Sequence, residues 1–172
     1  AGTMIHRFPF ESMRPLKESD IPAVIRLMQP AMEQGILVQR SINSILKRLQ
    51  DYVVFAADQQ IVGCGALHAW GEDSAEIAAL ASDVEKGGTG VGNQILQYLI
   101  KRAETQGFQR LFVLTTQTAD WFAQYGFVEA SYTDLPEKRR ESYDVKRRSK
   151  VLIKEVAGKV SGKCEERFCF GN

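Results

Sequence analysis

Apolar residues along the chain recur with two different periods, and each period predicts a different kind of element. Between residues 95 and 103 the apolar positions all fall on one face of a 3.6-residue period, which predicts a helix. Short continuous apolar runs bounded by turn residues are typical of buried strands, and segments 52–56, 61–67, 76–81 and 110–115 have this form. Strands that alternate with helices predict an α/β fold with a mixed sheet.

Shorter segments complete this pattern. A strand is expected at 13–16, and a helix is expected to begin after Ser19 or Asp20, to carry Pro22 in its first turn and to end or kink at Pro30. The further predicted features are a helix after Ser41, a hairpin turn at 58–60, a turn at 72–74, a helix C-cap at Gly107, a short helix at 120–124, a strand after Gly126, a brief basic helix at 137–143 and a last strand at 151–153.

A glycine-rich run, residues 85–92, lies between a predicted strand and a predicted helix. This order places backbone N–H groups at the positive end of a helix, an arrangement that binds phosphate groups. A P-loop is excluded because Gly90-Val91-Gly92-Asn93 has no Lys followed by Ser or Thr. A dinucleotide fingerprint is disfavoured because Glu104 lies inside the following helix. A glycine turn without a ligand stays open as an alternative.

Composition and charge restrict the classes of protein. The chain has 172 residues, 44% of them hydrophobic, and a net charge of +1, which fits one domain and favours neither nucleic acid nor a membrane as partner. Three sparse cysteines are typical of a reduced, cytoplasmic protein. His6 and His68 are isolated, so no metal site is expected. We expect an N-terminal extension at 1–12, the domain at 13–156 and a loosely ordered tail at 157–172, which contains Cys164 and Cys169.

The spacing Gly87-x-x-Gly90-x-Gly92 resembles the pyrophosphate loop of the GCN5-related N-acetyltransferases (GNAT), with Gly87 at the position of the usual leading Gln or Arg. Over about residues 13–155 the chain also resembles the acetyltransferase domain of the N-acetylglutamate synthases. The segments that carry this resemblance are 35–41, 112–116, 121–122, 125–127, 135–137 and 146–152.

The resemblance implies a fold and an activity. The fold is the GNAT fold, a mixed sheet of about seven strands with a splay between strands 4 and 5, flanked by about four helices. The activity is transfer of acetyl from acetyl-coenzyme A to the α-amine of L-glutamate, the first step of arginine biosynthesis. Main-chain groups of one set of residues would hold the cofactor: Leu80, Ala81 and Ser82 the pantetheine arm, and Gly87, Gly88, Thr89, Gly90, Val91 and Gly92 the pyrophosphate.

The same resemblance implies residues for chemistry and for the acceptor. Glu76 would be the base that prepares a neutral amine. Phe122 stands where many GNAT enzymes place a tyrosine acid, so Tyr125, Tyr143 or unassisted thiolate release remain as alternatives. The two carboxylates of glutamate call for cationic anchors, for which arginine is well suited. The places that the resemblance gives them are Arg40 with Ser41, Lys138 or Arg139, and Arg147 with Ser149.

Several alternatives stay open. The basic residues between 138 and 154 fit a solvated face as well as a binding site. The acceptor could be another amino acid, a small amine or a peptide N-terminus, and the domain could instead be a non-catalytic module that binds acetyl-coenzyme A. The enzyme family usually carries an amino-acid-kinase-like domain as well. We expect either a homodimer or association with such a domain.

Overall fold

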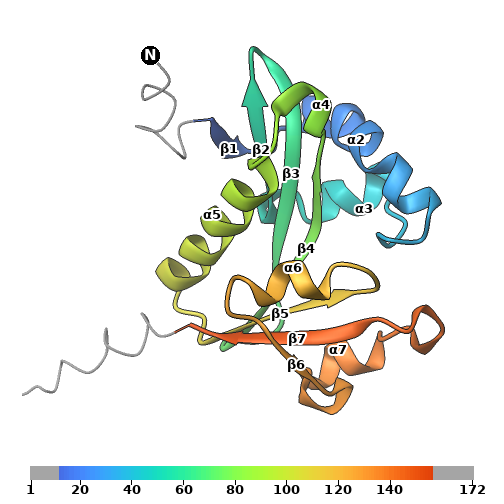
Figure 1. Ribbon diagram of the computed structural model, residues 1–172, viewed down its shortest axis with the longest axis vertical. Helices are drawn as coiled ribbons and strands as arrows, with labels where there is room; N and C mark the ends of the chain where they lie inside the picture. The colour runs from blue at the N-terminus through green and yellow to red at the C-terminus, as the bar shows by residue number, and fades with distance from the viewer. Residues whose placement is uncertain (1–11, 157–172) are drawn as a thin grey trace, which may run out of the picture. The chain divides into compact units, whose positions relative to one another are not determined.

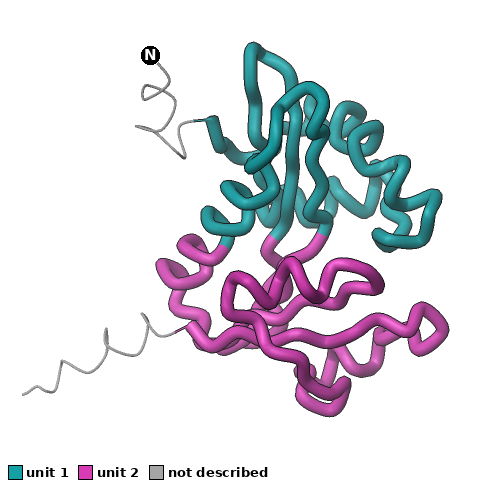
Figure 2. The backbone as a smooth tube through the Cα atoms, in the orientation of Figure 1, with its two compact units in different colours: residues 1–66, 79–99 teal, residues 67–78, 100–172 magenta. Residues whose placement is uncertain are grey.

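The computed structural model describes residues 12–156, in which seven strands form a mixed sheet of order β1-β2-β3-β4-β5-β7-β6 (Figure 1). The predicted tail and all but the last residue of the predicted N-terminal extension lie outside the described residues. The chain divides into two compact units, residues 1–66 with 79–99 and residues 67–78 with 100–172 (Figure 2). The expected α/β fold with a mixed sheet is confirmed.

The first unit contains the N-terminal elements and the glycine-rich loop. Its elements are β1 (Met13–Pro15), η1 (Glu18–Asp20), α2 (Ile21–Glu33), α3 (Ile42–Lys47), η2 (Leu49–Asp51), β2 (Tyr52–Ala57), most of β3 (Gln60–Ala69), the end of β4 (Ser74–Ser82), α4 (Val84–Gly87) and the start of α5 (Val91–Gln106). The predicted hairpin joins β2 to β3 through Asp58 and Gln59, which both have positive φ (51° and 66°), as a two-residue hairpin turn requires.

The core of the first unit forms between α2 and the strands. The apolar face of α2, which includes Val24 and Met28, is completely buried against a cluster that contains Tyr52 and Val54. Of the two outcomes predicted at Pro30, an end of the helix is wrong, because α2 continues to Glu33, and a kink stays a prediction. Burial of Met32 in the core stabilises the last turn and offsets the hydrogen bond that proline cannot donate.

The start of α5 packs closely on β3. A Cβ at Gly65 would lie 2.8 Å from Ile95 Cγ2 and 2.9 Å from Leu99 Cδ1. Only glycine therefore allows the helix to approach the strand this closely without a shift of the apolar side chains on α5. This contact fixes the position of the first turns of α5, next to the glycine-rich loop.

The second unit contains the remaining elements. They are the β3–β4 turn, the end of α5, β5 (Arg110–Thr115), α6 (Ala119–Ala123), β6 (Val128–Ala130), η3 (Tyr132–Asp134), α7 (Glu137–Glu141), η4 (Val145–Arg147) and β7 (Lys150–Glu155). β7 pairs antiparallel with β5 along its whole length and with β6 on its other edge. Phe112, Leu135 and Val151 form a buried core cluster of this unit.

The parallel pair of β4 and β5 is short. It extends from Ser74 opposite Arg110 to Glu76 opposite Phe112, although β4 continues to Ser82 and β5 to Thr115. The strands part after Glu76, which is the splay that the resemblance implied. Residues 12–156 contain six α-helices instead of about four, because short helices form at 84–87 and elsewhere. Within this range no helix has the length and apolar character needed to cross a membrane.

Candidate functional site

The glycine-rich run contains one helical turn as well as a loop. Asp83 caps α4 by accepting a hydrogen bond from Lys86 N at 3.2 Å. The amides of Gly87 and Gly88 donate to Asp83 O and Val84 O, each at 2.8 Å. These two amides, which were expected to bind pyrophosphate, are therefore used inside α4. The part of the run that can present amides to a ligand begins at Thr89.

The next residues form an open turn that leads into a long helix. Gly88 and Gly90 have φ of +80° and +93°, and a Cβ at either would have no heavy atom within 4 Å. The first helical bond of α5 joins Gln94 N to Gly90 O at 3.0 Å, so the amides of Val91 and Gly92 precede the hydrogen-bonded ladder. An exposed glycine turn with such amides at a positive helix end fits a diphosphate group.

Gly87 lies in close contact with β3 and α5. A Cβ at this position would lie 2.8 Å from Val62 Cγ2 and 3.0 Å from Val91 Cγ2. A Gln or Arg side chain at Gly87 would therefore collide with the β3 and α5 residues that hold the loop. The chain departs from the usual GNAT pattern here because this backbone lies directly on Val62.

Strand β4 contains an irregularity just before the three residues expected to bind the pantetheine arm. Ala79 is buried and has φ of +56°, a conformation that costs a non-glycine residue about 1 kcal/mol. Its carbonyl accepts a hydrogen bond from Cys64 Sγ at 3.3 Å. Leu80 and Ala81 are half-buried and Ser82 is exposed. Nothing in the alanine-rich sequence indicated this change of backbone direction.

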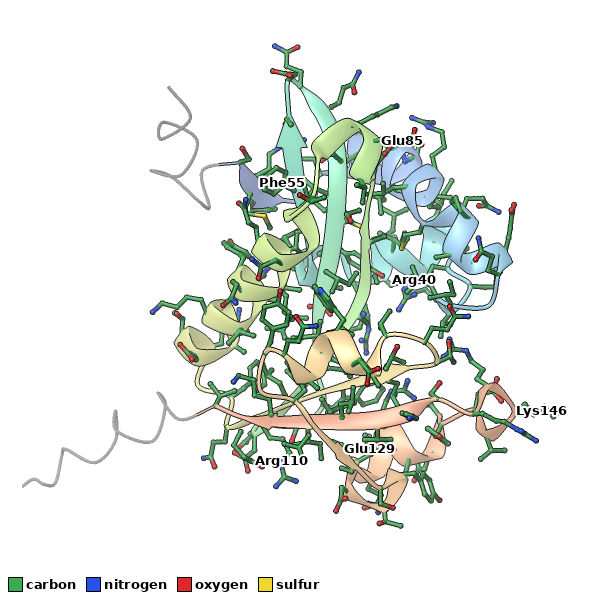
Figure 3. All side chains as sticks on the ribbon, in the orientation of Figure 1. Arg40, Phe55, Glu85, Arg110, Glu129 and Lys146 are labelled. Carbon is green, nitrogen blue, oxygen red and sulfur yellow. The ribbon has the colours of Figure 1, made fainter. Side chains whose placement is uncertain are left out.

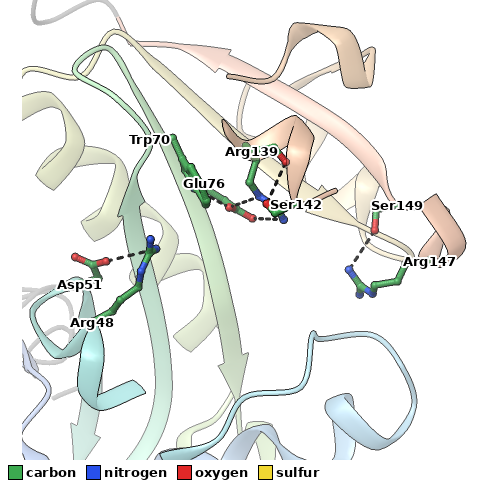
Figure 4. Close-up of polar contacts among 8 residues, drawn as sticks. All are labelled: Arg48, Asp51, Trp70, Glu76, Arg139, Ser142, Arg147 and Ser149. Carbon is green, nitrogen blue, oxygen red and sulfur yellow. Dashed lines mark hydrogen bonds and ion pairs between the residues drawn. The ribbon is translucent and has the colours of Figure 1, made fainter. Parts of the chain in front are cut away.

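Glu76 lies at the centre of a polar cluster in the second unit (Figure 4). Its Oε1 accepts from Arg139 Nε at 2.8 Å and from Trp70 Nε1 at 3.1 Å, and its Oε2 accepts from Arg139 Nη2 at 3.4 Å. The side chains of Glu76 and Arg139 are only 9% and 14% exposed. The structure thus joins the expected base directly to one of the expected substrate anchors.

Two further residues of this cluster were missed from the sequence. The Trp70 ring lies 5.7 Å from Arg139 Cζ, and Ser142 Oγ accepts from Arg139 Nη1 at 3.0 Å. Trp70 N donates to Ser74 O across the β3–β4 turn, and this register places Trp70 and Glu76 on one face of the hairpin. The alternation of side chains along the two strands could have indicated from the sequence that Trp70 and Glu76 share a face. The contact with Ser142 depends on how α7 packs and could not have been predicted in this way.

Arg147 and Ser149 lie together, as expected, and Tyr143 joins them. Arg147 Nη1 donates to Ser149 Oγ at 3.2 Å, and the Tyr143 hydroxyl donates to Ser149 O at 2.8 Å. The proton of Tyr143 is therefore engaged with a backbone carbonyl. Lys138 is exposed on α7 and Lys146 extends from η4 (Figure 3).

Arg40 and Ser41 lie in the first unit. Arg40 Nη1 donates to Val38 O at 3.0 Å, and the charge of Arg40 acts on Tyr52. Burial raises the pKa of Tyr52, and nearby Arg40 opposes this shift. Ser41 caps α3 by accepting from Ser44 N at 3.1 Å. The hydroxyl of Ser41 thus already has a structural role.

The remaining candidate acid, Tyr125, belongs to an aromatic group on and after α6. Its ring lies 5.1 Å from Trp121, edge to face, and it is half-buried. Phe122 is buried and contacts Phe127 at 5.5 Å, so the residue at the usual tyrosine position forms part of the core. Among residues 12–156, no three His, Cys, Asp or Glu side chains gather as metal ligands.

Comparison with known proteins gives consistent similarities. A family model described as acetyltransferase (GNAT) domain matches residues 49–129. The amino-acid acetyltransferase of Pasteurella multocida is 37% identical over 92% of this chain and 36% of its own length. That of Ralstonia nicotianae is 36% identical over 90% of this chain and 35% of its own length. The chain therefore spans about a third of the length of these relatives.

Solved structures show the same relationship. N-acetylglutamate synthase from Neisseria gonorrhoeae, complexed with coenzyme A and N-acetyl-glutamate, is 36% identical with a TM-score of 0.81, over 84% of this chain and 35% of that one. Rv2747 from Mycobacterium tuberculosis, in complex with CoA and NLQ, is 27% identical with a TM-score of 0.71, over 83% of this chain and 98% of that one.

Proposed function

The chain belongs to the GNAT acetyltransferase family, and from this premise we propose that it transfers acetyl from acetyl-coenzyme A to the α-amino group of L-glutamate. The observation that carries the proposal is the similarity, at 36% identity, to a synthase complexed with coenzyme A and N-acetyl-glutamate. This reaction is the first step of arginine biosynthesis and would occur in the cytoplasm.

The residues around the glycine turn fit the cofactor. The amides from Thr89 to Gly92 donate to the pyrophosphate at the start of α5, where a diphosphate gains from the helix dipole. Main-chain groups of Leu80, Ala81 and Ser82, the last three residues of β4, hold the pantetheine arm. When bound, acetyl-coenzyme A supplies the acetyl group as a thioester, whose carbonyl carbon the amine attacks as the C–S bond breaks.

The acceptor needs one cationic contact for each carboxylate. Arg139 and Arg147 each donate to a serine hydroxyl, Ser142 and Ser149, which fixes the direction of each guanidinium. Arginine can bind a carboxylate through two parallel N–H groups, so fixed guanidinium groups give both affinity and orientation. Lys138 and Arg40 with Ser41 remain further proposed contacts.

Glu76 is the proposed base, and Tyr143 and Tyr125 are the two candidate acids. A base is needed because only the neutral amine attacks the thioester. The Tyr143 hydroxyl is held by Ser149 O, next to the Arg147 pair, whereas Tyr125 lies among aromatic rings on α6. Departure of the thiolate without an acid is the alternative for the last proton transfer.

The relatives are about two and a half times as long as this chain. We therefore also propose that the domain acts as a homodimer or together with an amino-acid-kinase-like domain. Its direct partner is a small amine substrate, and no nucleic acid or membrane takes part.

An acceptor panel tests the proposal. The purified chain is mixed with acetyl-coenzyme A and, separately, with L-glutamate, L-glutamine, L-aspartate, glycine or a short peptide, and release of thiol is followed. We expect the highest kcat/KM with glutamate, and a lower value with glutamine because it lacks the second charge. If only another amine is acetylated, that amine and not glutamate is the acceptor. Tight binding of coenzyme A without turnover on any amine would indicate a binding module instead.

A further inference from the structure

The ion pair between Glu76 and Arg139 conflicts with the separate tasks proposed for its members. While Arg139 donates two hydrogen bonds to Glu76, it cannot use the same N–H groups for a substrate carboxylate. Glu76 in turn accepts three hydrogen bonds from Arg139 and Trp70, which fill three of the about four lone-pair sites of its carboxylate. Binding of a substrate carboxylate by these N–H groups of Arg139 thus requires that the pair open, and opening also frees lone pairs of Glu76 for a proton.

Each member of the pair has a second support that does not depend on the other. Arg139 Nη1 donates to Ser142 Oγ, and the Arg139 guanidinium lies over the Trp70 ring. Glu76 accepts from the indole N–H of Trp70. When the ion pair opens, both charged groups would therefore keep a fixed position instead of turning into solvent.

The charges of the pair define what can open it. Both side chains are mostly buried, and separation of a buried pair by a neutral molecule would leave two unpaired charges, which is strongly unfavourable. A molecule with an ammonium next to a carboxylate replaces one ion pair by two: its carboxylate binds Arg139 and its ammonium binds Glu76. An α-amino acid has these two groups on one carbon atom.

Resting on the proposed function, we propose that an α-amino acid acceptor inserts between Glu76 and Arg139, and that Trp70 and Ser142 position the two side chains for this exchange. Glu76 then takes a proton from the bound ammonium, so that one N–H bond breaks and one O–H bond forms. The neutral amine attacks the thioester. Its remaining surplus proton goes to the departing thiolate, and the proton on Glu76 returns to water.

Through this exchange, Arg139 and Glu76 would select acceptors that carry a carboxylate next to the amine. An amine without an adjacent carboxylate leaves the Arg139–Glu76 ion pair closed, so Glu76 is less accessible to its ammonium. The exchange selects α-amino acids whatever their side chain, whereas Arg147 and Ser149 are the proposed contacts of a second carboxylate. The two requirements can therefore be tested with different ligands.

The indole N–H of Trp70 reports the exchange without any need for turnover. The chain has two tryptophans, so a ¹⁵N–¹H spectrum shows two indole signals, which Trp70→Phe assigns. With coenzyme A present, we expect L-glutamate to move the Trp70 signal and to leave that of Trp121 nearly unchanged. Glutarate, which lacks the amine, and glutamic acid α-amide, which lacks the α-carboxylate, should have little effect. An unmoved Trp70 signal at saturating glutamate, with binding verified by calorimetry, would overturn the exchange.

A pair of variants tests selectivity. In wild-type protein we expect kcat with L-glutamate to exceed kcat with its α-amide by at least tenfold. Arg139→Met frees Glu76 for both acceptors, so this ratio should fall towards one. Arg140→Met is the matched control, because Arg140 lies next to Arg139 on α7 but donates to the backbone oxygens of Leu135 and Thr133. An unchanged ratio in active Arg139→Met would overturn the proposal.

The two proposals fail in different ways. If wild-type protein acetylates no amine, the proposed function is wrong, and the Trp70 signal still shows whether an amino acid opens the pair. If wild-type protein acetylates glutamate but the Trp70 signal and the selectivity ratio do not respond, only the exchange is wrong. Should Arg139→Met not fold, the wild-type titration decides alone.

Discussion

Arg139 Nε and Glu76 Oε1 lie 2.8 Å apart, although 63 residues separate these side chains along the chain. The contact joins α7 to the start of β4, and it combines a proposed base with a proposed substrate anchor. Neither residue has a local sequence pattern that marks the other as its partner. Arg139 is therefore mostly buried, whereas Lys138 and Lys146 are exposed.

Replacement of Glu76 tests its role as a base. We expect Glu76→Gln to lower kcat by about 100-fold, because a positioned general base contributes this much or more. The affinity for coenzyme A, measured by calorimetry, should stay unchanged. Glu129→Gln, which removes an exposed carboxylate on β6, is the control. A kcat within twofold of wild type would show that Glu76 does not accept the proton.

Replacement of Arg147 tests the acceptor contact. Arg147→Ala should raise the KM for glutamate by about 10- to 100-fold, because a hydrogen bond to a charged group contributes about 1.5–3 kcal/mol. The KM for acetyl-coenzyme A should change little. Lys146→Ala removes a neighbouring exposed charge and is the control. Equal effects of Arg147→Ala on both KM values would mean that Arg147 does not hold the acceptor.

The glycine turn can be tested at matched backbone angles. Gly90 and Gly107 have φ of +93° and +91°, and a Cβ at either position would have no heavy atom within 4 Å. Alanine at either site should lower the free energy of unfolding by about 1 kcal/mol. Only Gly90→Ala should also weaken binding of coenzyme A, by about tenfold, because it changes the turn that presents the amides. Equal cofactor affinities in the two variants would argue against a pyrophosphate site at the turn.

The ion pair at the start of α2 predicts a pH dependence of stability. Arg14 Nη1 donates to Asp20 Oδ2 at 2.7 Å, and this contact lowers the pKa of Asp20 below its ordinary value of 3.8. The unfolded chain therefore binds the proton more readily than the folded one. The stabilisation is fully present above the ordinary pKa and is lost as the pH falls through the lower folded value.

Asp20→Asn measures this contribution, because asparagine keeps an acceptor for the Lys17 amide but has no charge. Urea unfolding should show a less stable variant near neutral pH, and the difference from wild type should shrink in acid. Asp73→Asn, at an exposed turn, should show no such trend. A difference that stays constant with pH would contradict the assigned pKa shift.

Cys64 should be unreactive in the folded protein. Burial raises the pKa of its thiol to about 12, and Sγ donates to Ala79 O. Because the thiolate is the reactive form, iodoacetamide near neutral pH should leave Cys64 unmodified until the protein is unfolded in urea. Mass spectrometry of the Cys64 peptide checks this. Modification of folded protein at the unfolded rate would contradict it.

Much of the fold could be predicted because it depends on local pattern. The helical period from Ile95 to Ala103 and the C-cap at Gly107 located α5, and the short polar turn at 58–60 located the β2–β3 hairpin. The end of α2 was missed because burial of Met32 outweighs the effect of Pro30 on the backbone. Local sequence could not supply that tertiary contribution.

The sequence predicted several residues of the candidate site, but it did not predict which of them contact one another. The resemblance pointed to Glu76, Arg139 and the glycine turn, but it did not indicate that Glu76 and Arg139 bind each other. It also assigned a ligand contact to Gly87, whose amide donates within α4. Long-range pairing and the choice of hydrogen-bond acceptor depend on packing between distant segments, which spacing along the chain does not encode.

The most direct test of the central claim observes the product bond. The chain is incubated with acetyl-coenzyme A and ¹⁵N-labelled L-glutamate, and ¹⁵N–¹H spectra are recorded over time. Formation of an amide should produce a growing N–H signal at the position of N-acetylglutamate, at a rate proportional to the amount of protein. Absence of this signal, in a sample that binds coenzyme A, would contradict the proposed acetyl transfer to glutamate.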